Sequence, residues 1–257
     1  MAQLNLEFRG HTALLTMSNP PANTWTQDTL TALRDTVRSL NQNNDVYALV
    51  ITGEGQKFFS AGADLKLFAD GDKAVASDMA RIFGEAFETL SQFRGVSIAA
   101  INGYAMGGGL EVALACDIRI AETQAQLALP EAKVGLLPCA GGTQNLAWLV
   151  GEGWAKRMIL CGERLSADKA LQIGLVEEVV GSGEALAAAL ALAEKVAEQS
   201  PSSVTACKKL IQQGRSSAIN AALPLERELF VGLFDTKDQV EGVSAFLQKR
   251  PPQWVNG

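Results

Sequence analysis

The sequence predicts an α/β protein, and three observations support that class. Short runs of β-branched and aliphatic residues, typical of strands buried on both faces, occur at 12–17, 46–52, 96–101 and 117–121. Helical patterns separate these runs. After about Gly183 no convincing strand follows. Strands that alternate with helices, followed by helices alone, indicate an α/β core with a helical C-terminal region.

The helices are predicted from the spacing of apolar residues. Between Thr26 and Leu40, and again from Met79 to Leu90, apolar residues recur three and four positions apart, which places them on one helix face. We therefore expect helices over both stretches, between the predicted strands.

The end of the chain carries start signals for further helices. Ser200 precedes a proline, as an N-cap precedes the first helical position, and Thr236 to Gln239 has the form of a capping box. We predict an active-site core over 1–195 and a helical region over 196–257. The helices of this second region carry more apolar surface than the region can bury within itself. This favours packing of the region on a neighbouring subunit.

Composition and charge exclude several classes of function. The net charge of −6 and the lack of a Lys/Arg stripe argue against binding nucleic acid. The four cysteines form no CxxC pair and the single histidine, His11, lies in an early strand-like run, so we expect buried thiols and no metal site. The apolar run 96–121 is interrupted by two acids and by glycines, and the N-terminus lacks a signal-peptide pattern, so neither membrane nor secretion is expected. A reducing cytoplasm fits these features.

Three consecutive glycines followed closely by an acid form the most informative stretch, "GYAMGGGLE" at 103–111. It lies where a predicted strand leads into a predicted helix. Backbone N–H groups at a helix N-terminus bind anions, and glycine lets a ligand approach them closely. Judged on this stretch alone, the glycines could instead form a tight turn with close packing and bind no ligand. The spacing of a dinucleotide-binding fingerprint is absent.

A second glycine-bearing loop follows another predicted strand, in "VITGEGQKFFSAGADL" at 50–65. Two such loops could each supply one N–H donor to the same oxygen atom. Donors arranged in this way stabilise an oxyanion that develops during a reaction.

The chain resembles enoyl-CoA hydratases of the crotonase family. The resemblance rests on "SAGADL" at 60–65, "INGYAMGGGLE" at 101–111, "LPEAKVGLLPCAGGTQ" at 129–144 and "SAFLQKR" at 244–250, which span most of the chain in the family's order. It implies a crotonase-like spiral of ββα units with a C-terminal helical oligomerisation region. It also implies reversible addition of water to a trans-2-enoyl-CoA, within β-oxidation or related fatty-acid metabolism.

The resemblance assigns roles to particular residues. It implies an oxyanion hole formed by the backbone N–H groups of Ala63 and Gly108. It implies that Glu111 and Glu131 are the two catalytic acids, with Glu111 activating water and Glu131 protonating C2. The positions assigned to substrate or coenzyme A are Ala61, Gly62, Asp64, Leu65, Gly107, Phe246 and Lys249.

Three positions in the matched motifs need separate comment. Asp64 belongs to the motif, but an Asp in a loop bonds readily to nearby backbone, so we expect it to cap the loop. Cys139 and Asn145 stand where the family commonly has glycine and arginine. These two departures affect packing near the pocket and the selection of the acyl group, while the catalytic assignment is retained.

The resemblance further implies a homotrimer or a dimer of trimers that binds an acyl-CoA thioester and needs no separate cofactor or metal. Two alternatives stay open. One is another reaction of a thioester enolate, such as that of an isomerase, decarboxylase, thioesterase or dehalogenase. The other is a non-catalytic protein that binds coenzyme A or RNA. The presence of both glutamates favours the hydratase.

Overall fold

Two β-sheets form the framework of the computed structural model, which describes residues 3–68, 71–215 and 219–257. The larger sheet has the strand order β1-β2-β3-β5-β7-β10. Its strands are β1 (Gln3–Arg9), β2 (Thr12–Ser18), β3 (Ala48–Gly53), β5 (Val96–Ile101), β7 (Ile118–Glu122) and β10 (Glu178–Val180). Only β1 pairs antiparallel with its neighbour; the other pairs are parallel. The predicted runs all form strands of this sheet.

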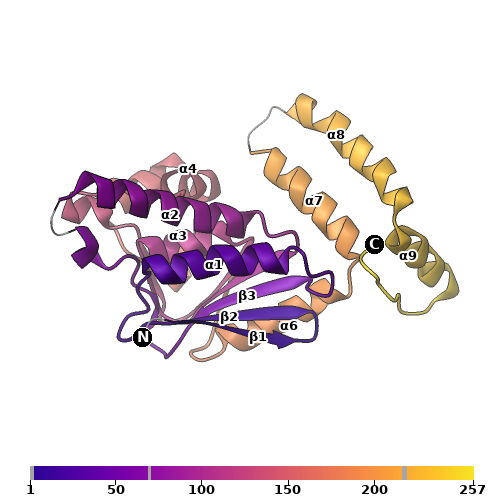
Figure 1. Cartoon of the computed structure of the whole chain (residues 1–257), viewed down its shortest axis with the longest axis horizontal. Coiled ribbons are helices and arrows are strands. Elements are labelled where there is room, and N and C mark those ends of the chain that lie inside the picture. Colours follow the sequence, from indigo (N-terminus) through magenta and orange to yellow (C-terminus); the bar gives the residue numbers. More distant parts are fainter. Residues whose placement is uncertain (1–2, 69–70, 216–218) are drawn as a thin grey trace.

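Helices cover both faces of the larger sheet, which explains why β3 is buried at every position. The helices α1 (Gln27–Leu40) and α2 (Lys73–Ser91) lie on one side and α6 (Ala185–Ala197) lies on the other (Figure 1). Alternate residues of a strand therefore enter different cores. Ile51 packs with the α1 and α2 side, whereas Val50 packs against α6.

The smaller sheet gives the fold its repeating unit. Its strands are β4 (Phe58–Ser60), β6 (Tyr104–Met106), β8 (Gln126–Ala128) and β9 (Leu165–Ser166), in that order. Each of β3, β5 and β7 is followed by a short strand of this sheet and then by helical structure, which repeats a ββα unit. The predicted α/β spiral is confirmed by this arrangement.

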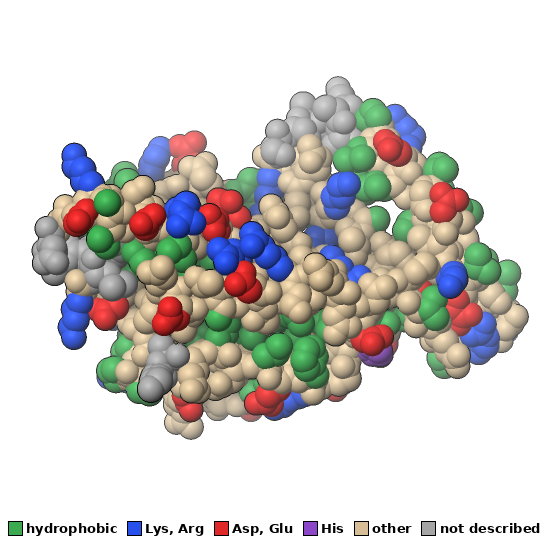
Figure 2. Space-filling model, in the orientation of Figure 1, with side chains coloured by type: hydrophobic (Ala, Val, Ile, Leu, Met, Phe, Trp, Pro, Cys, Tyr) green, Lys and Arg blue, Asp and Glu red, His purple; other side chains and the backbone are tan. Residues whose placement is uncertain are grey.

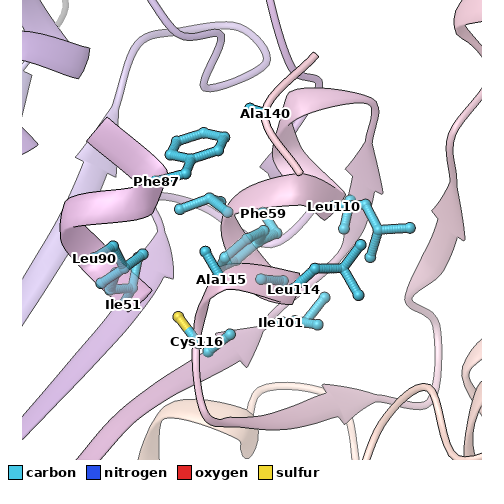
Figure 3. Close-up of a cluster of buried hydrophobic side chains, with 14 of the residues drawn as sticks. Ile51, Phe59, Phe87, Leu90, Ile101, Leu110, Leu114, Ala115, Cys116 and Ala140 are labelled. Atoms are coloured by element: carbon cyan, nitrogen blue, oxygen red, sulfur yellow. The ribbon is translucent and has the colours of Figure 1, made fainter. Parts of the chain in front are cut away.

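The helix α3 (Gly108–Ala115) is buried along its whole length. Figure 3 shows Leu110 and Leu114 of α3 packed with Phe87 of α2 and with Ile101 of the larger sheet. A helix that is apolar on all sides belongs in the core. Its first turn is therefore held rigidly, and this turn carries the triple glycine and the acid that follows it.

The remaining helices of the core are α4 (Gly142–Leu160) and α5 (Ala167–Gln172), with short 3₁₀ turns η1 (Leu65–Phe68) and η2 (Glu131–Val134). Both 3₁₀ turns follow short strands of the smaller sheet. They carry residues that the sequence analysis assigned to the site.

Three helices project from the core at the C-terminal end (Figure 1): α7 (Pro201–Gln213), α8 (Ile219–Gly232) and, after the turn η3 (Leu233–Asp235), α9 (Lys237–Gln248). Ser200 caps α7 as predicted, with Pro201 in its first turn. Thr236 caps α9 by accepting from the Gln239 N–H. Figure 2 shows hydrophobic side chains along the outer surface of these helices.

One lysine fastens this helical region to the core. The Nζ of Lys208 on α7 donates to the carbonyl oxygens of Phe93 and Gly95 and to the Asp117 carboxylate, at 2.6, 2.9 and 2.7 Å. These partners lie immediately before β5 and β7. These hydrogen bonds therefore join α7 to one end of the larger sheet.

Two expectations from the sequence are wrong. His11 lies in the turn between β1 and β2 rather than in a strand, and its ring stacks on Tyr47. Only Cys116 is a buried thiol, because Cys139, Cys161 and Cys207 are exposed. Within the described ranges, no helix is both long and apolar enough to cross a membrane.

Candidate active site

The two glycine-bearing loops meet at the start of α3. Gly62 has φ of +87°, and a Cβ atom there would lie 2.7 Å from the Met106 carbonyl oxygen and 2.9 Å from the Gly108 nitrogen. Glycine is therefore required both by the backbone conformation and by the close approach. Gly108 is the first residue of α3, so its N–H has no acceptor within the helix. The loop that ends at Ala63 is thus packed directly against the start of α3.

A cavity of about 1010 Å³ opens beside this junction. It extends between α2, the start of α3, η1, η2 and the loop that follows η2. The predicted site residues that line it are Ala61, Ala63, Asp64, Leu65, Gly107, Gly108, Glu111 and Glu131. Residues more than 60 positions apart in the sequence therefore meet around one space.

Glu111 is held in a fixed orientation. Its side chain comes from the first turn of α3 and is 3% exposed. Its Oε1 accepts hydrogen bonds from the backbone N–H groups of Ala140 and Gly142, at 2.8 and 2.9 Å. Burial raises the pKa of this carboxyl, and the two backbone donors oppose that rise.

Gly142 is needed for this arrangement. A Cβ atom at this position would lie 2.8 Å from Oε1 of Glu111 and 2.9 Å from a Pro138 carbon. Real Cβ atoms do not approach so closely. The first residue of α4 can therefore donate to the carboxylate only because it lacks a side chain.

Glu131 differs from Glu111 in its environment. It begins η2, and both carboxyl oxygens are buried without a hydrogen-bond partner among the described residues. Burial first, and then the charge of Glu111, raise the pKa of Glu131 to about 7. A Cβ atom at Gly107 would lie 3.1 Å from Oε1 of Glu131, so this carboxyl faces the glycine loop.

The structure therefore brings together two buried acids in different hydrogen-bonding environments and a pair of glycine loops. A carboxyl with a pKa near 7 can give or take a proton at neutral pH. The start of α3 offers a free N–H and the positive end of a helix dipole to a nearby anionic oxygen. This combination suits proton transfer to and from a substrate whose oxygen becomes negatively charged.

Asp64 caps its loop as expected, since its Oδ1 accepts from the Lys66 N–H at 3.1 Å. Cys139 lines the cavity. Although the residue as a whole is exposed, the surrounding protein removes part of the water around its thiol, and this desolvation, with the charges of Glu111 and Glu131, raises the pKa of the thiol to about 11. Asn145 lies on α4, where its amide nitrogen would be 3.0 Å from a Cβ atom at Gly141.

Phe246 and Lys249 lie away from the cavity within one chain. Phe246 is 82% exposed on α9, and Lys249 ends that helix in a left-handed conformation. Neither lines the cavity of its own chain. The role that the resemblance gives them requires a neighbouring subunit.

The sequence analysis missed the apolar wall of the cavity. This wall is formed by Ala76, Ala80 and Phe83 on α2 and by Val134, Leu136 and Leu137 after η2. The helical spacing of 76, 80 and 83 places these three on one face, but periodicity alone does not distinguish a face packed in the core from one that borders a cavity.

The chain belongs to the enoyl-CoA hydratase/isomerase family, whose model matches residues 7–257. It is 40% identical over 255 residues to 2,3-dehydroadipyl-CoA hydratase of Escherichia coli, with 99% of each chain covered. It is 37% identical to the short-chain-enoyl-CoA hydratase of Clostridium acetobutylicum, over 95% of this chain and 94% of that protein. Among solved structures, DspI of Pseudomonas aeruginosa matches with a TM-score of 0.96 and 69% identity, covering 98% of this chain and 96% of that one.

Proposed function

We propose that this protein is a hydro-lyase that adds water reversibly to a trans-2-enoyl-CoA, giving a 3-hydroxyacyl-CoA. The observation that carries the proposal is the pair of glutamates that open into one cavity beside the glycine loops. Hydration needs one group to take a proton from water and another to give a proton to carbon. A relative named short-chain-enoyl-CoA hydratase, at 37% identity, and one named 2,3-dehydroadipyl-CoA hydratase, at 40% identity, support the same reaction.

In the proposed mechanism, Glu111 accepts a proton from water as the water oxygen attacks C3 of the substrate. The electron pair of the double bond moves toward the thioester oxygen, which becomes an enolate oxygen. The N–H groups of Ala63 and Gly108 stabilise that charge, and the protonated Glu131 carboxyl then gives its proton to C2. Because these donors are backbone groups on rigid elements, little reorganisation is needed during the reaction.

The environments of the two acids support this division of work. Burial raises the pKa of Glu111, which strengthens it as a base, and the hydrogen bonds from Ala140 and Gly142 oppose that rise and orient the carboxylate. The pKa of about 7 keeps a substantial fraction of Glu131 protonated at neutral pH, as an acid requires.

Coenzyme A enters this proposal as part of the substrate, and no separate cofactor is invoked. We assign Ala61, Gly62, Leu65 and Gly107 to the loops that hold the thioester. Phe246 and Lys249 would reach the adenine and phosphate end of coenzyme A bound mostly by a neighbouring subunit, within a homotrimer or a dimer of trimers. The exposed position of Phe246 on α9 is compatible with such a contact. We also propose that the protein acts in the cytoplasm, in the catabolism of fatty acids or related acyl-CoA compounds.

The test replaces each glutamate by glutamine, which keeps the shape and removes the acid. We expect Glu111→Gln and Glu131→Gln each to lower kcat for hydration of crotonyl-CoA by about 10² to 10⁴, because this is the usual contribution of a positioned acid or base. Loss of the conjugated enoyl absorbance measures the rate. Near-normal hydration by either variant would remove that residue from the mechanism.

A second reaction separates the two roles. Exchange of the α-proton of a saturated acyl-CoA with solvent deuterium requires proton transfer at C2 but no addition of water. Glu131→Gln should abolish this exchange, whereas Glu111→Gln should retain more of it. The opposite pattern would exchange the two assignments. Unchanged enoyl absorbance in the wild-type protein, with coenzyme A still bound, would favour either another reaction of a thioester enolate, such as that of an isomerase, decarboxylase or thioesterase, or a non-catalytic binding protein.

A further inference from the structure

The peptide between Gly62 and Ala63 carries one of the two N–H groups assigned to the oxyanion hole. Gly62 has φ of +87°, and a glycine lets the peptide that follows it rotate at little cost because no side chain opposes the rotation. Rotation by half a turn would reverse the direction of the Ala63 N–H. Contacts made by other residues must therefore hold this peptide in one orientation.

One such contact holds the carbonyl end of the peptide. The Trp25 N–H donates to the Gly62 carbonyl oxygen at 2.8 Å, and Trp25 and Ala63 form an isolated parallel bridge. In a planar trans peptide the C=O and the N–H point in opposite directions, so the Ala63 N–H points away from the backbone of Trp25. Within the described part of the chain this N–H has no acceptor. It is therefore available to a substrate oxygen in the cavity, which Ala63 lines.

A second contact holds the peptide that precedes Gly62. Ser60, at the end of β4, is fully buried, and its Oγ accepts from the Gly62 N–H at 3.2 Å. The same hydroxyl donates to the Asn23 carbonyl oxygen at 2.7 Å. A serine hydroxyl can donate one hydrogen bond and accept others, and here it uses both capacities. The Ser60 hydroxyl therefore joins the loop at 61–63 to residues 22–25.

The segment on the other side of this contact is itself held firmly in the core. Trp25 is 2% exposed, and its ring packs edge-on against Phe87 of α2. The Nδ2 of Asn23 donates to the carbonyl oxygens of Glu54 and Phe58, at 3.0 and 2.9 Å. A segment with these contacts provides a rigid support for the loop beside it.

We propose that the Ser60 hydroxyl positions the oxyanion hole by holding the Gly62–Ala63 peptide with its N–H directed into the cavity. Ser60 does not itself line the cavity, so it acts through that peptide. The proposal rests on the proposed function, because it takes the Ala63 N–H as a donor to the thioester oxygen.

Loss of the hydroxyl would affect the enolate more than the substrate. The buried Gly62 N–H would lose its partner, and the peptide that follows would rotate more freely. A negatively charged oxygen accepts a stronger hydrogen bond than a neutral carbonyl oxygen does. Displacement of the Ala63 N–H therefore costs the enolate more stabilisation than it costs the neutral thioester.

The test follows the ionisation of acetoacetyl-CoA bound to the protein. This thioester has no double bond to hydrate, and it loses a proton from C2 to give an enolate with a different ultraviolet absorbance. Hydrogen bonds to the enolate oxygen lower the pH at which half of the bound ligand is ionised. We expect Ser60→Ala to raise this midpoint by about 0.5 to 1 pH unit, a three- to tenfold effect, as for the loss of one hydrogen bond.

Hydration kinetics provide a second measurement on the same variant. For crotonyl-CoA, Ser60→Ala should lower kcat about three- to tenfold and change KM by less than about twofold. A variant that only folded poorly would also lower the apparent kcat, but its folded molecules would ionise the bound ligand at the wild-type midpoint. A wild-type midpoint in Ser60→Ala would therefore overturn the proposal.

A cysteine at the same position separates hydrogen bonding from packing. Ser60→Cys fills nearly the same space, but its thiol is a weak donor and a weak acceptor, so the midpoint should rise as it does in Ser60→Ala. This variant also provides the test if Ser60→Ala does not fold. A wild-type midpoint in Ser60→Cys would show that the side chain only fills space, which contradicts the proposal.

Ser97→Ala is the matched control. Ser97 on β5 is also fully buried, and its hydroxyl also makes one hydrogen bond as donor and one as acceptor, to the carboxylate and from the N–H of Asp117. The same atoms are lost, but Ser97 makes no contact with the loop at 61–63. This variant should keep the wild-type midpoint. A midpoint raised equally in Ser97→Ala would show that the shift does not depend on the contact between Ser60 and Gly62.

The two measurements also separate this proposal from the proposed function. Hydration of crotonyl-CoA together with unshifted midpoints in the Ser60 variants would leave the hydratase intact and refute the role of Ser60. Shifted midpoints without hydration of any enoyl-CoA would support the role of Ser60 and refute the hydratase. Acetoacetyl-CoA that ionises at the same pH when free and when bound to the wild type would contradict the oxyanion hole, and the role of Ser60 with it.

Discussion

Glu131 carries a proton in the folded protein over a pH range in which an exposed glutamate has lost it. Its pKa is about 7 in the fold against an ordinary value of 4.5. Between these values the folded state binds the additional proton, so the stability that this group contributes falls as the pH rises. Its contribution is largest below about pH 4.5 and is lost above about pH 7.

We therefore expect a particular pH dependence of thermal stability. The Tm of the wild-type protein minus the Tm of Glu131→Gln should fall as the pH rises from about 4.5 to 7. Above about pH 7 this difference should stay constant. The glutamine does not titrate, so the change reports on Glu131. Differential scanning calorimetry across this range measures the difference. A difference that does not vary with pH would show that Glu131 ionises as an exposed glutamate does.

At this scale the sequence analysis predicted that Glu111 and Glu131 belong to one site, and both line the same cavity, but it did not show how their environments differ. The resemblance to the crotonase family, carried by the segments that hold Glu111 and Glu131, assigned both to one pocket; neither position would have done so alone. The two backbone donors to Glu111 come from residues about 30 positions away, in the loop before α4 and at its start. Nothing in the local pattern around Glu111 indicates those contacts, which oppose the rise in pKa that burial causes.

At the scale of elements, the start of α4 acts on the site through Gly142. A Cβ atom here would displace the Glu111 carboxylate or push α4 away from it. We expect Gly142→Ala to lower kcat for hydration at least tenfold, because small displacements of a catalytic group have large effects on rate. The KM for the thioester should change less, since the glycine loops are unaltered.

Gly153→Ala provides the matched control for Gly142→Ala. Gly153 lies in the same helix, and a Cβ atom there meets no atom within 4 Å. This change should leave kcat unaltered and should stabilise the helix slightly, because alanine is the better helix former. If both variants lost activity equally, the contact between Gly142 and Glu111 would not explain the effect.

The elements also show what sequence patterns can and cannot predict. Four strands of the larger sheet followed from runs of apolar residues, and α1 and α2 followed from helical spacing, whereas β1 and α4 were not predicted. The strands β4, β6 and β8 were missed because three residues are too few to show a period. Pairing within the smaller sheet makes them strands, and this pairing joins segments far apart in the sequence.

At the scale of the whole molecule, the C-terminal helices leave apolar side chains uncovered. Phe230 and Val231 at the end of α8 and Phe234 in η3 are each more than half exposed, as are Val240 and Val243 on α9. We expect a second copy of the chain to cover part of this surface, in line with the proposed trimer or hexamer.

Sedimentation at several concentrations tests this expectation. Phe230→Asp should weaken association at least tenfold, because a carboxylate would be buried at the contact. Phe8→Asp, at an exposed apolar position on β1, should leave the association unchanged. A wild-type protein that stays monomeric and active at assay concentration would contradict both the oligomer and the completion of the site by a neighbouring subunit.

The attachment of α7 through Lys208 has a consequence for how the isolated chain opens. Few described residues of α7, α8 and α9 are buried, among them Pro201, Asp238 and Ala245. Segments with little buried apolar surface open at a lower free-energy cost than the core. The amide hydrogens of these helices should therefore exchange with solvent deuterium together and before those of β3 and β5. Lys208→Met should speed that exchange in the helices and leave the strands protected, whereas association of subunits should slow it.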